Sequence, residues 1–193
     1  MCNVGQASMC YFYFDFRDIS KQHRRDLLTS FLFQLSSRSG PCGYILSRLY
    51  AAYDSGTRQP SDQDLTTCLN EMLTVSDQCQ IYLIIDALDE SPDTSGISCP
   101  REQVLQLVKD IVEFCLPKLH ICVTSRLKPD IRDAILPIAS HWVSLHDQDG
   151  QKNDIMDYVR SVVYSTSELF MRGWEEEEKD LVVKTLSIRA DGV

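Results

Sequence analysis

In Ile81-Tyr82-Leu83-Ile84-Ile85-Asp86-Ala87-Leu88-Asp89-Glu90, an unbroken apolar run ends abruptly in acidic residues. Parallel strands that are buried on both faces have continuous Val, Ile and Leu runs of this kind. In open α/β sheets, ligands bind beyond the carboxyl ends of such strands. The stretch therefore predicts a central parallel strand near 81–86 that brings carboxylates to a site.

The three carboxylates suit metal and water chemistry. Asp86 would lie at the end of the strand, where a carboxylate can hold Mg²⁺, usually through water, because this hard ion loses its hydration shell reluctantly. Asp89 and Glu90 in the next turn could orient or deprotonate an attacking water. The alternative is a core strand followed by an acidic, solvated turn, and the strand pattern by itself does not separate the two.

Length and charge narrow the class of protein. The 193 residues fit one domain with a sizeable core, or one domain and the beginning of another. The net charge of −9, with Glu175 to Glu178 as the longest run of like charge, gives no electrostatic footprint for nucleic acid or an anionic membrane. No apolar run reaches the length of a bilayer span, and no signal peptide is recognisable, so we expect a cytoplasmic protein.

The eight cysteines form no recognisable zinc or disulfide pattern. None is part of a Cys-x-x-Cys pair, and no histidine lies at ligand spacing from one. Cys10 and Cys122 lie in apolar runs, where cysteine behaves as a small hydrophobe. We therefore expect scattered, reduced thiols.

Strands and helices alternate along the chain. Further strands are predicted near 9–16, 119–124 and 142–145, and helices lie between or after them. Apolar residues recur at helical spacing near 21–37, 45–50, 61–73, 101–116, 129–136, 154–164 and 176–189, which predicts helices there. Strands separated by helices of this length are typical of βαβ units, which form a parallel α/β sheet.

The residues after the run at 119–124 would share the sheet edge with Asp86. Arg126 follows Ser125 there, and the planar, permanently cationic guanidinium can sense or stabilise phosphate charge. The alternative is a salt bridge to Asp86 or Asp89. The loop 91–100 follows the acidic turn, and the sequence is equally consistent with a flap over the site and with a plain surface connection.

Four stretches resemble the NACHT or nephrocystin-like N-terminal domain of fungal STAND-type P-loop NTPases. They are Tyr11 to Asp18, Ile81 to Glu90, Thr124 to Arg126 and Val143 to Asp147. The resemblance implies a three-layer α/β fold with a parallel P-loop NTPase-like sheet that lacks the P-loop strand. It implies a partial NTPase domain at 1–147 and a helical extension at 148–193.

The same resemblance assigns roles to the site residues. Asp86 corresponds to the metal-binding aspartate of the Walker B motif, and Asp89 and Glu90 to the catalytic acids that follow it. Arg126 corresponds to a sensor arginine that binds nucleotide together with Ser125. The implied cofactor is Mg²⁺ with ATP or GTP, in a signal-transduction switch that changes conformation and oligomerises through protein partners or self-association.

One motif of that family is missing, because the sequence contains no Gly-x-x-x-x-Gly-Lys-Ser/Thr. This Walker A loop supplies the backbone cradle, the lysine for the phosphates and a hydroxyl for Mg²⁺. We therefore expect weak or absent nucleotide binding and an N-terminally truncated copy of the domain. In such domains the P-loop strand lies between those predicted here at 119–124 and 142–145, so the last strand should be poorly paired or lie against 119–124.

Two alternatives stay open. The first is a non-catalytic interaction or regulatory fragment that keeps the fold and binds no nucleotide of its own. The second is a metal-dependent phosphohydrolase that uses Asp86, Asp89 and Glu90 alone, although two-metal sites need more ligands than one turn provides.

Overall fold

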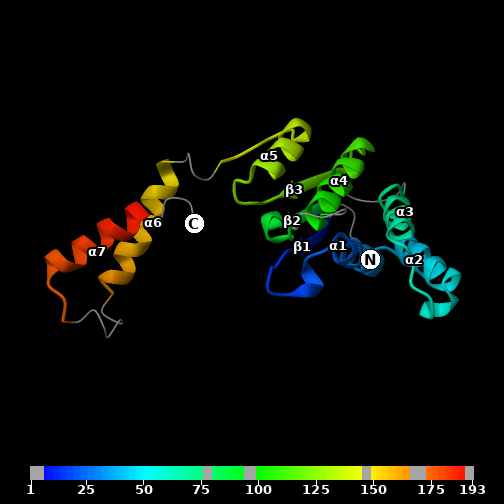
Figure 1. Ribbon diagram of the computed structural model, residues 1–193, viewed down its shortest axis with the longest axis horizontal. Coiled ribbons are helices and arrows are strands. Elements are labelled where there is room, and N and C mark those ends of the chain that lie inside the picture. Colours follow the sequence, from blue (N-terminus) through cyan, green and yellow to red (C-terminus); the bar gives the residue numbers. More distant parts are fainter. Residues whose placement is uncertain (1–6, 76–79, 94–98, 145–148, 166–172, 190–193) are drawn as a thin grey trace. The chain divides into compact units, whose positions relative to one another are not determined.

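The computed structural model describes residues 7–75, 80–93, 99–144, 149–165 and 173–189. The chain divides into two compact units, Met1–Ala139 and Ser140–Val193. The first holds the sheet and most of the described helices, and the described part of the second holds two helices (Figure 1). The domain boundary that we predicted between residues 147 and 148 lies outside the described residues.

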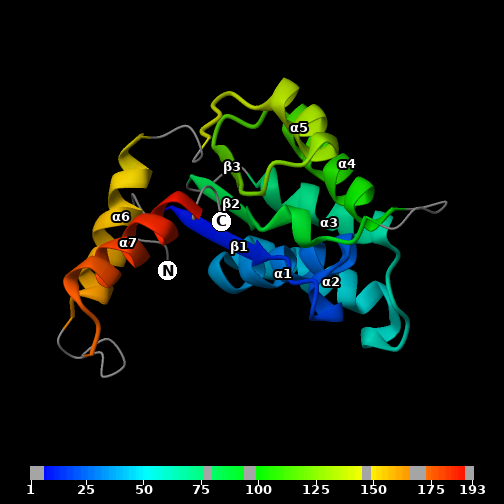
Figure 2. The same ribbon diagram turned by 60° about the vertical axis from the view of Figure 1, so that its left-hand side comes forward.

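The first unit is built on a parallel sheet of three strands, β1 (Ser8–Tyr13), β2 (Ile81–Asp86) and β3 (Leu119–Val123), in the order β1-β2-β3. Figure 2 shows these strands side by side. Ser8 pairs with Ile81, and Ile81 pairs with Leu119, so the three strands run in step towards the same carboxyl edge. The predicted α/β class, with a P-loop-like parallel sheet that lacks a strand, is confirmed.

Each longer helix of this unit overlaps a helical range predicted from the sequence, although the helix predicted at 45–50 is longer than predicted. The longer ones in this unit are α1 (Arg24–Arg38), α2 (Gly40–Ala52), α3 (Asp62–Leu73), α4 (Pro100–Glu113) and α5 (Pro129–Ile135). Short 3₁₀ turns are η1 (Ile19–Lys21), η2 (Asp54–Gly56), η3 (Leu88–Glu90) and η4 (Leu136–Ile138). Helix α1 begins at Arg24 and not near residue 21 as we predicted. Ser20 and its neighbours form η1 instead, and the backbone N–H of His23 donates to Asp26 at 3.0 Å, which caps α1 at His23.

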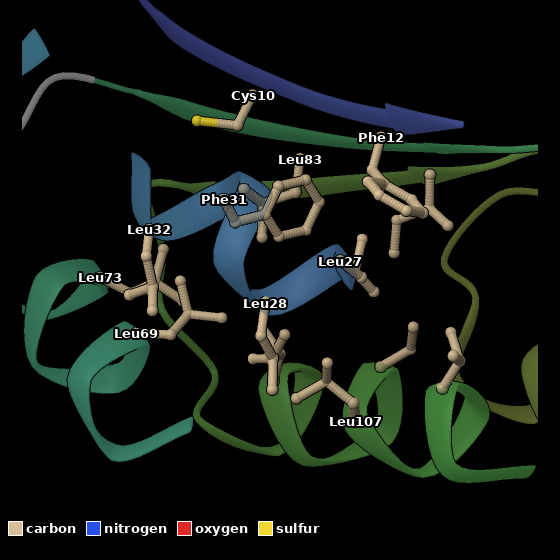
Figure 3. Packing of buried hydrophobic residues seen from close by; sticks show 14 of the residues in the cluster. Cys10, Phe12, Leu27, Leu28, Phe31, Leu32, Leu69, Leu73, Leu83 and Leu107 are labelled. Atoms are coloured by element: carbon tan, nitrogen blue, oxygen red, sulfur yellow. The ribbon is translucent and has the colours of Figure 1, made fainter. Parts of the chain in front are cut away.

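One hydrophobic core joins the sheet to α1, α3 and α4 (Figure 3). Phe31 of α1 lies among Leu83 of β2, Cys10 of β1 and the leucines of the neighbouring helices, and its side chain is fully buried. Apolar spacing of three and four residues in α1 places its buried side chains on one stripe, as amphipathic helices require. This core fixes the strands whose ends carry the site.

The opposite face of the sheet is exposed, which corrects our expectation that the strands are buried on both faces. Along β1, buried residues alternate with the exposed Met9, Tyr11 and Tyr13, and Tyr82 of β2 lies on the same face as these. Tyr82 stacks on His120 of β3 with ring centroids 4.7 Å apart. The described helices of this unit therefore leave an aromatic sheet face uncovered.

The two edges of the sheet differ. On β1, Gln34 of α1 binds both outward backbone groups of Tyr11, since its Oε1 accepts from the N–H at 3.1 Å and its Nε2 donates to the carbonyl at 2.8 Å. On β3, the backbone N–H of Thr124 donates to the Ile85 carbonyl, so the groups of Ile121 and Val123 face the other way. No described strand pairs with that side of β3.

The predicted strand at 142–145 does not form in its described part, because residues 142–144 pair with no strand. A strand needs a partner for its backbone groups, and alternation of side chains alone does not supply one. This agrees with our expectation that the last strand would be poorly paired. Residue 145 lies outside the described residues.

The second unit contains α6 (Asp149–Val163) and α7 (Glu176–Arg189), which pack against each other. Tyr164 donates a hydrogen bond to Asp180 at 2.8 Å and so ties the end of α6 to α7. Helix α7 has the bounds that the sequence predicts, with Glu176, Glu177 and Glu178 in its first turn. Among the helices that the structure describes, none has the length and apolar character needed to cross a membrane.

Candidate functional site at the carboxyl edge of the sheet

The site is built where β2 and β3 end. Asp86 is the last residue of β2 and accepts a hydrogen bond from the hydroxyl of Thr124, which follows β3. The same hydroxyl oxygen accepts from the N–H of Ala87 at 3.1 Å, and the Leu88 N–H donates to the Thr124 carbonyl at 3.0 Å. These bonds hold the two strand ends together and leave the Asp86 carboxylate at the surface.

Ala87 turns the chain sharply after β2. Its φ is +53°, in the left-handed region that costs a non-glycine residue about 1–2 kcal/mol. The hydrogen bonds to Thr124 stabilise this turn, and η3 follows at once. The turn therefore aims Asp89 and Glu90 back towards the strand ends.

Asp89 is buried and fully engaged by Arg126. Its side chain is 3% exposed, and it accepts hydrogen bonds from the Arg126 backbone N–H at 3.0 Å and from the Arg126 guanidinium. The Arg126 side chain is 67% exposed. In this conformation Asp89 orients the loop after β3, and its carboxylate is not available as a free base.

Glu90 joins three loops of the edge. Its Oε2 accepts from the backbone N–H of Phe16, after β1, at 3.3 Å, and its Oε1 lies 3.6 Å from the Arg126 guanidinium. The loops after β1, β2 and β3 therefore meet at one carboxylate. The predicted convergence of the acids and Arg126 at this edge is what the structure has.

The partners of Arg126 are resolved by the geometry. We expected Asp86 to come within reach of Arg126, directly or through one water. The described direct contacts pair Arg126 with Asp89 and Glu90, so the salt bridge to Asp89 that we gave as an alternative forms, while Asp86 is bound by Thr124. The hydroxyl of Ser125 donates to the Arg126 carbonyl at 2.7 Å, and its contact with nucleotide stays a prediction. The middle of the predicted flap, residues 94–98, lies outside the described residues.

Arg101 is a site residue that sequence reasoning missed. Its side chain is 8% exposed and donates to the carbonyls of Asp89 at 2.8 Å and Ser91 at 2.8 and 3.0 Å. It also pairs with Asp130 of α5 at 3.1 Å. We treated Arg101 only as the first residue of a helix, and a charged residue at the start of an apolar stripe carries no signal that it will be buried.

The family of the chain follows from comparison with known proteins. Residues 2–126, well over half of the 193, match the family described as Nephrocystin 3, N-terminal. The chain belongs to this family. The match contains every site residue named above from Phe16 to Arg126, but not Asp130. No curated protein and no solved structure matches the chain.

The donor set of this nephrocystin 3 N-terminal domain fits Mg²⁺ only in part. Asp86 is an exposed carboxylate, and Mg²⁺ is commonly bound through one or two carboxylates, waters and substrate phosphates. Asp89 is occupied by Arg126, and no group of three or more potential ligands occurs among the described residues. The described side chains at this edge therefore do not surround a metal ion on their own. They suit an ion that is already bound to the phosphates of a ligand.

Asp89 makes the stability of this nephrocystin-type domain depend on pH. Burial raises the pKa of Asp89, but the hydrogen bonds and charge of Arg126 outweigh it, so the pKa lies below its usual value. A carboxyl group with a lowered folded-state pKa stabilises the fold above its unfolded pKa of about 3.9 and loses this effect as the pH falls through the folded value. We expect Asp89→Asn to destabilise the domain at pH 7 by about 1.5–3 kcal/mol.

Urea unfolding of both proteins between pH 7 and pH 3 measures this effect. The difference between wild type and Asp89→Asn should shrink below about pH 4. Asp54→Asn is the control, because Asp54 forms an exposed pair with Arg58 at 2.9 Å. Equal pH dependence of all three proteins would contradict the role given to Asp89.

Proposed function

We propose that this chain is part of a NACHT-type nucleotide switch of the fungal STAND kind, and that it supplies the acidic and sensor half of the nucleotide site. The observation that carries the proposal is the convergence of Asp86, Asp89, Glu90 and Arg126 at the carboxyl edge of a parallel sheet. Ligands of open α/β sheets bind at that edge. Membership of the nephrocystin 3 N-terminal family supports the signalling context.

Each residue has a distinct task in this proposal. Asp86 would hold Mg²⁺, which neutralises phosphate charge when it is bound. Glu90 has one oxygen towards Arg126 and one on the Phe16 N–H, so it can accept a proton or orient a water only at the exposed part of its carboxylate. Arg126 would leave Asp89 when phosphate offers a better partner, because guanidinium binds phosphate with a paired donor fork.

Exchange of Arg126 between Asp89 and phosphate is a two-state contact of the kind that switches need. Asp89 holds both the backbone and the side chain of Arg126, so release of the side chain need not release the loop. Such an exchange shifts a conformational equilibrium only by the difference in affinity between the two states. Ser125, beside Arg126, would contact the same phosphate after its hydroxyl rotates from the backbone.

The affinity of this chain for Mg·ATP should be weaker than millimolar. Most of the grip on a triphosphate comes from backbone N–H groups and a lysine of a P-loop, which the sequence lacks. Loss of several charge-assisted hydrogen bonds at about 1.5–3 kcal/mol each moves a micromolar affinity beyond millimolar. Isothermal titration should therefore show no saturation at micromolar concentrations, and micromolar binding abolished by Asp86→Asn would show that the chain has a competent nucleotide-binding site without a P-loop.

The place of the weak binding can be tested with Mn·ATP, because Mn²⁺ broadens nearby NMR signals. We expect broadening of the Ala87 and Thr124 amide signals, which flank Asp86, and its loss in Asp86→Asn. Asp110→Asn is the control, because Asp110 lies on α4 and accepts its hydrogen bond from Gln106. Broadening that is unchanged in Asp86→Asn would rule out the proposed site.

A second candidate function is a non-catalytic interaction module. The observation that favours it is the uncovered sheet face with Tyr11, Tyr13 and Tyr82, since exposed apolar patches of this kind often mark protein contacts. Protein partners or self-association would then be its ligands. Sedimentation at increasing protein concentration, with and without Tyr11→Ser, distinguishes self-association from a monomer.

A further inference from the structure

The loop after β1 places a second arginine next to the site. Glu90 accepts from the N–H of Phe16, and Arg17 is the next residue. The Arg17 guanidinium lies over the Phe16 ring at 5.7 Å from its centroid. The loop after β1 was not part of the predicted site, and its connection to Glu90 arises only in the folded chain.

The Arg17 side chain is held weakly. It is 76% exposed and binds Asp15 through Nε at 3.1 Å and through Nη2 at 3.4 Å. Ion pairs of this exposed kind contribute little to stability because water and salt screen them. The guanidinium can therefore exchange Asp15 for another anion at little cost.

The negative charge of Glu90 acts on both Arg17 and Arg126. Asp15 and, more weakly, Glu90 raise the pKa of Arg17, while Asp89 and, more weakly, Glu90 raise the pKa of Arg126. Each arginine thus has its own aspartate and a common glutamate. This arrangement puts two exposed guanidinium groups at one sheet edge, on the loops after the two outer strands.

We propose that Arg17 is a second phosphate-binding arginine of this site and contacts, beside Arg126, the polyphosphate of a Mg-nucleoside triphosphate. The inference rests on the proposed function and adds a contact to it. Two guanidinium forks on separate loops can each bind a different phosphate group of one chain through paired N–H donors. Arg17 would then help to select a polyphosphate over a single phosphate.

Magnesium is required in this proposal because carboxylates outnumber cations at the edge. The acidic residues of these loops and of the end of β2 are Asp15, Asp18, Asp86, Asp89, Glu90 and Asp93, against Arg17, Lys21, Arg126 and Lys128. The net negative charge of these side chains would repel a polyphosphate without a metal ion. Mg²⁺ bound to Asp86 would reduce this repulsion. Binding should therefore depend on both the ion and the two arginines.

The probe is Mg·tripolyphosphate, followed through the Nε–Hε signals of arginine side chains in ¹⁵N NMR spectra of the full chain. We expect the signals of Arg17 and Arg126 to shift together at millimolar concentrations, and those of Arg58 to stay. Arg17→Gln should raise the apparent Kd about tenfold, the effect of one lost charge-assisted hydrogen bond. The wild type should bind Mg·phosphate more weakly than Mg·tripolyphosphate. Arg17→Gln should bind the two about equally.

Arg58→Gln is a closely matched control. Arg58 is 65% exposed, pairs with Asp54 at 2.9 Å and lies over the Tyr53 ring at 5.5 Å, but it follows η2 and not a strand. Binding that Asp86→Asn weakens but Arg17→Gln leaves unchanged overturns the inference and keeps the proposed function. An equal loss of affinity in Arg17→Gln and Arg58→Gln also overturns the inference. If neither the Arg17 nor the Arg126 signal shifts at tens of millimolar Mg·tripolyphosphate, both the inference and the proposed function are overturned.

Discussion

Arg101→Met should destabilise the first unit by about 1–3 kcal/mol for each of the two buried carbonyls that it leaves without a donor. The carbonyls of Asp89 and Ser91 would lose their guanidinium donor in a buried place, and Asp130 would lose its partner. Methionine fills the space but donates no hydrogen bond, so the whole loss is polar. This is a large part of the stability of a domain, which is about 5–15 kcal/mol.

Urea unfolding followed by far-UV circular dichroism measures the loss. Arg132→Met is the matched control, because it makes the same change on α5 at an exposed position, where the described ion pair of Arg132 is with its neighbour Asp133 at 3.3 Å. That control should change stability by less than about 0.5 kcal/mol. Arg101→Lys should lie between the two, because lysine keeps the charge but cannot reach both carbonyls with a fixed fork. Near-equal stability of Arg101→Met and wild type would mean that the network contributes nothing.

Phe31→Ala should destabilise the same unit by about 3–5 kcal/mol, because it leaves a large cavity among the buried leucines of α1, α3 and the sheet. Phe31 is fully buried, while Phe33, two residues further on in the same helix, is 70% exposed. Phe33→Ala makes the same chemical change at a nearly identical position in the helix and should cost little. The pair separates the effect of burial from that of helix propensity.

Both tryptophans, Trp142 and Trp174, lie in the second unit, so tryptophan fluorescence reports mainly on that unit, whereas circular dichroism reports on both. Phe31→Ala should shift the circular dichroism transition to lower urea. If Phe31→Ala and Phe33→Ala shifted it equally, the packing described for α1 would be wrong.

Much of the fold follows from local patterns in the sequence. The apolar runs fix β2 and β3 to within a residue, and Ser61 with Asp64 forms the reciprocal cap that starts α3. Such signals are predictable because the interacting residues are close in sequence. Parallel strands also share a carboxyl edge, which is why Asp86 and Arg126 could be placed near each other.

The remainder depends on contacts between distant segments. Whether Arg126 would bind Asp86 or Asp89 is decided by the left-handed turn at Ala87, which aims Asp89 at the loop after β3. The exposed sheet face was misjudged although tyrosines alternate with buried residues along β1, a period of two that indicates a half-exposed strand. An aromatic run looks apolar in composition, but its hydroxyl groups tolerate water.

The unequal edges of the sheet give it a direction of growth. Gln34 of α1 binds the outward N–H and carbonyl of Tyr11 as the peptide of a further strand would, so a strand added beside β1 meets this side chain. The side of β3 that carries the outward groups of Ile121 and Val123 has no described strand against it. Next to β1 a further strand has to displace Gln34, whereas next to β3 it displaces no described strand, so the sheet lengthens more readily on the β3 side.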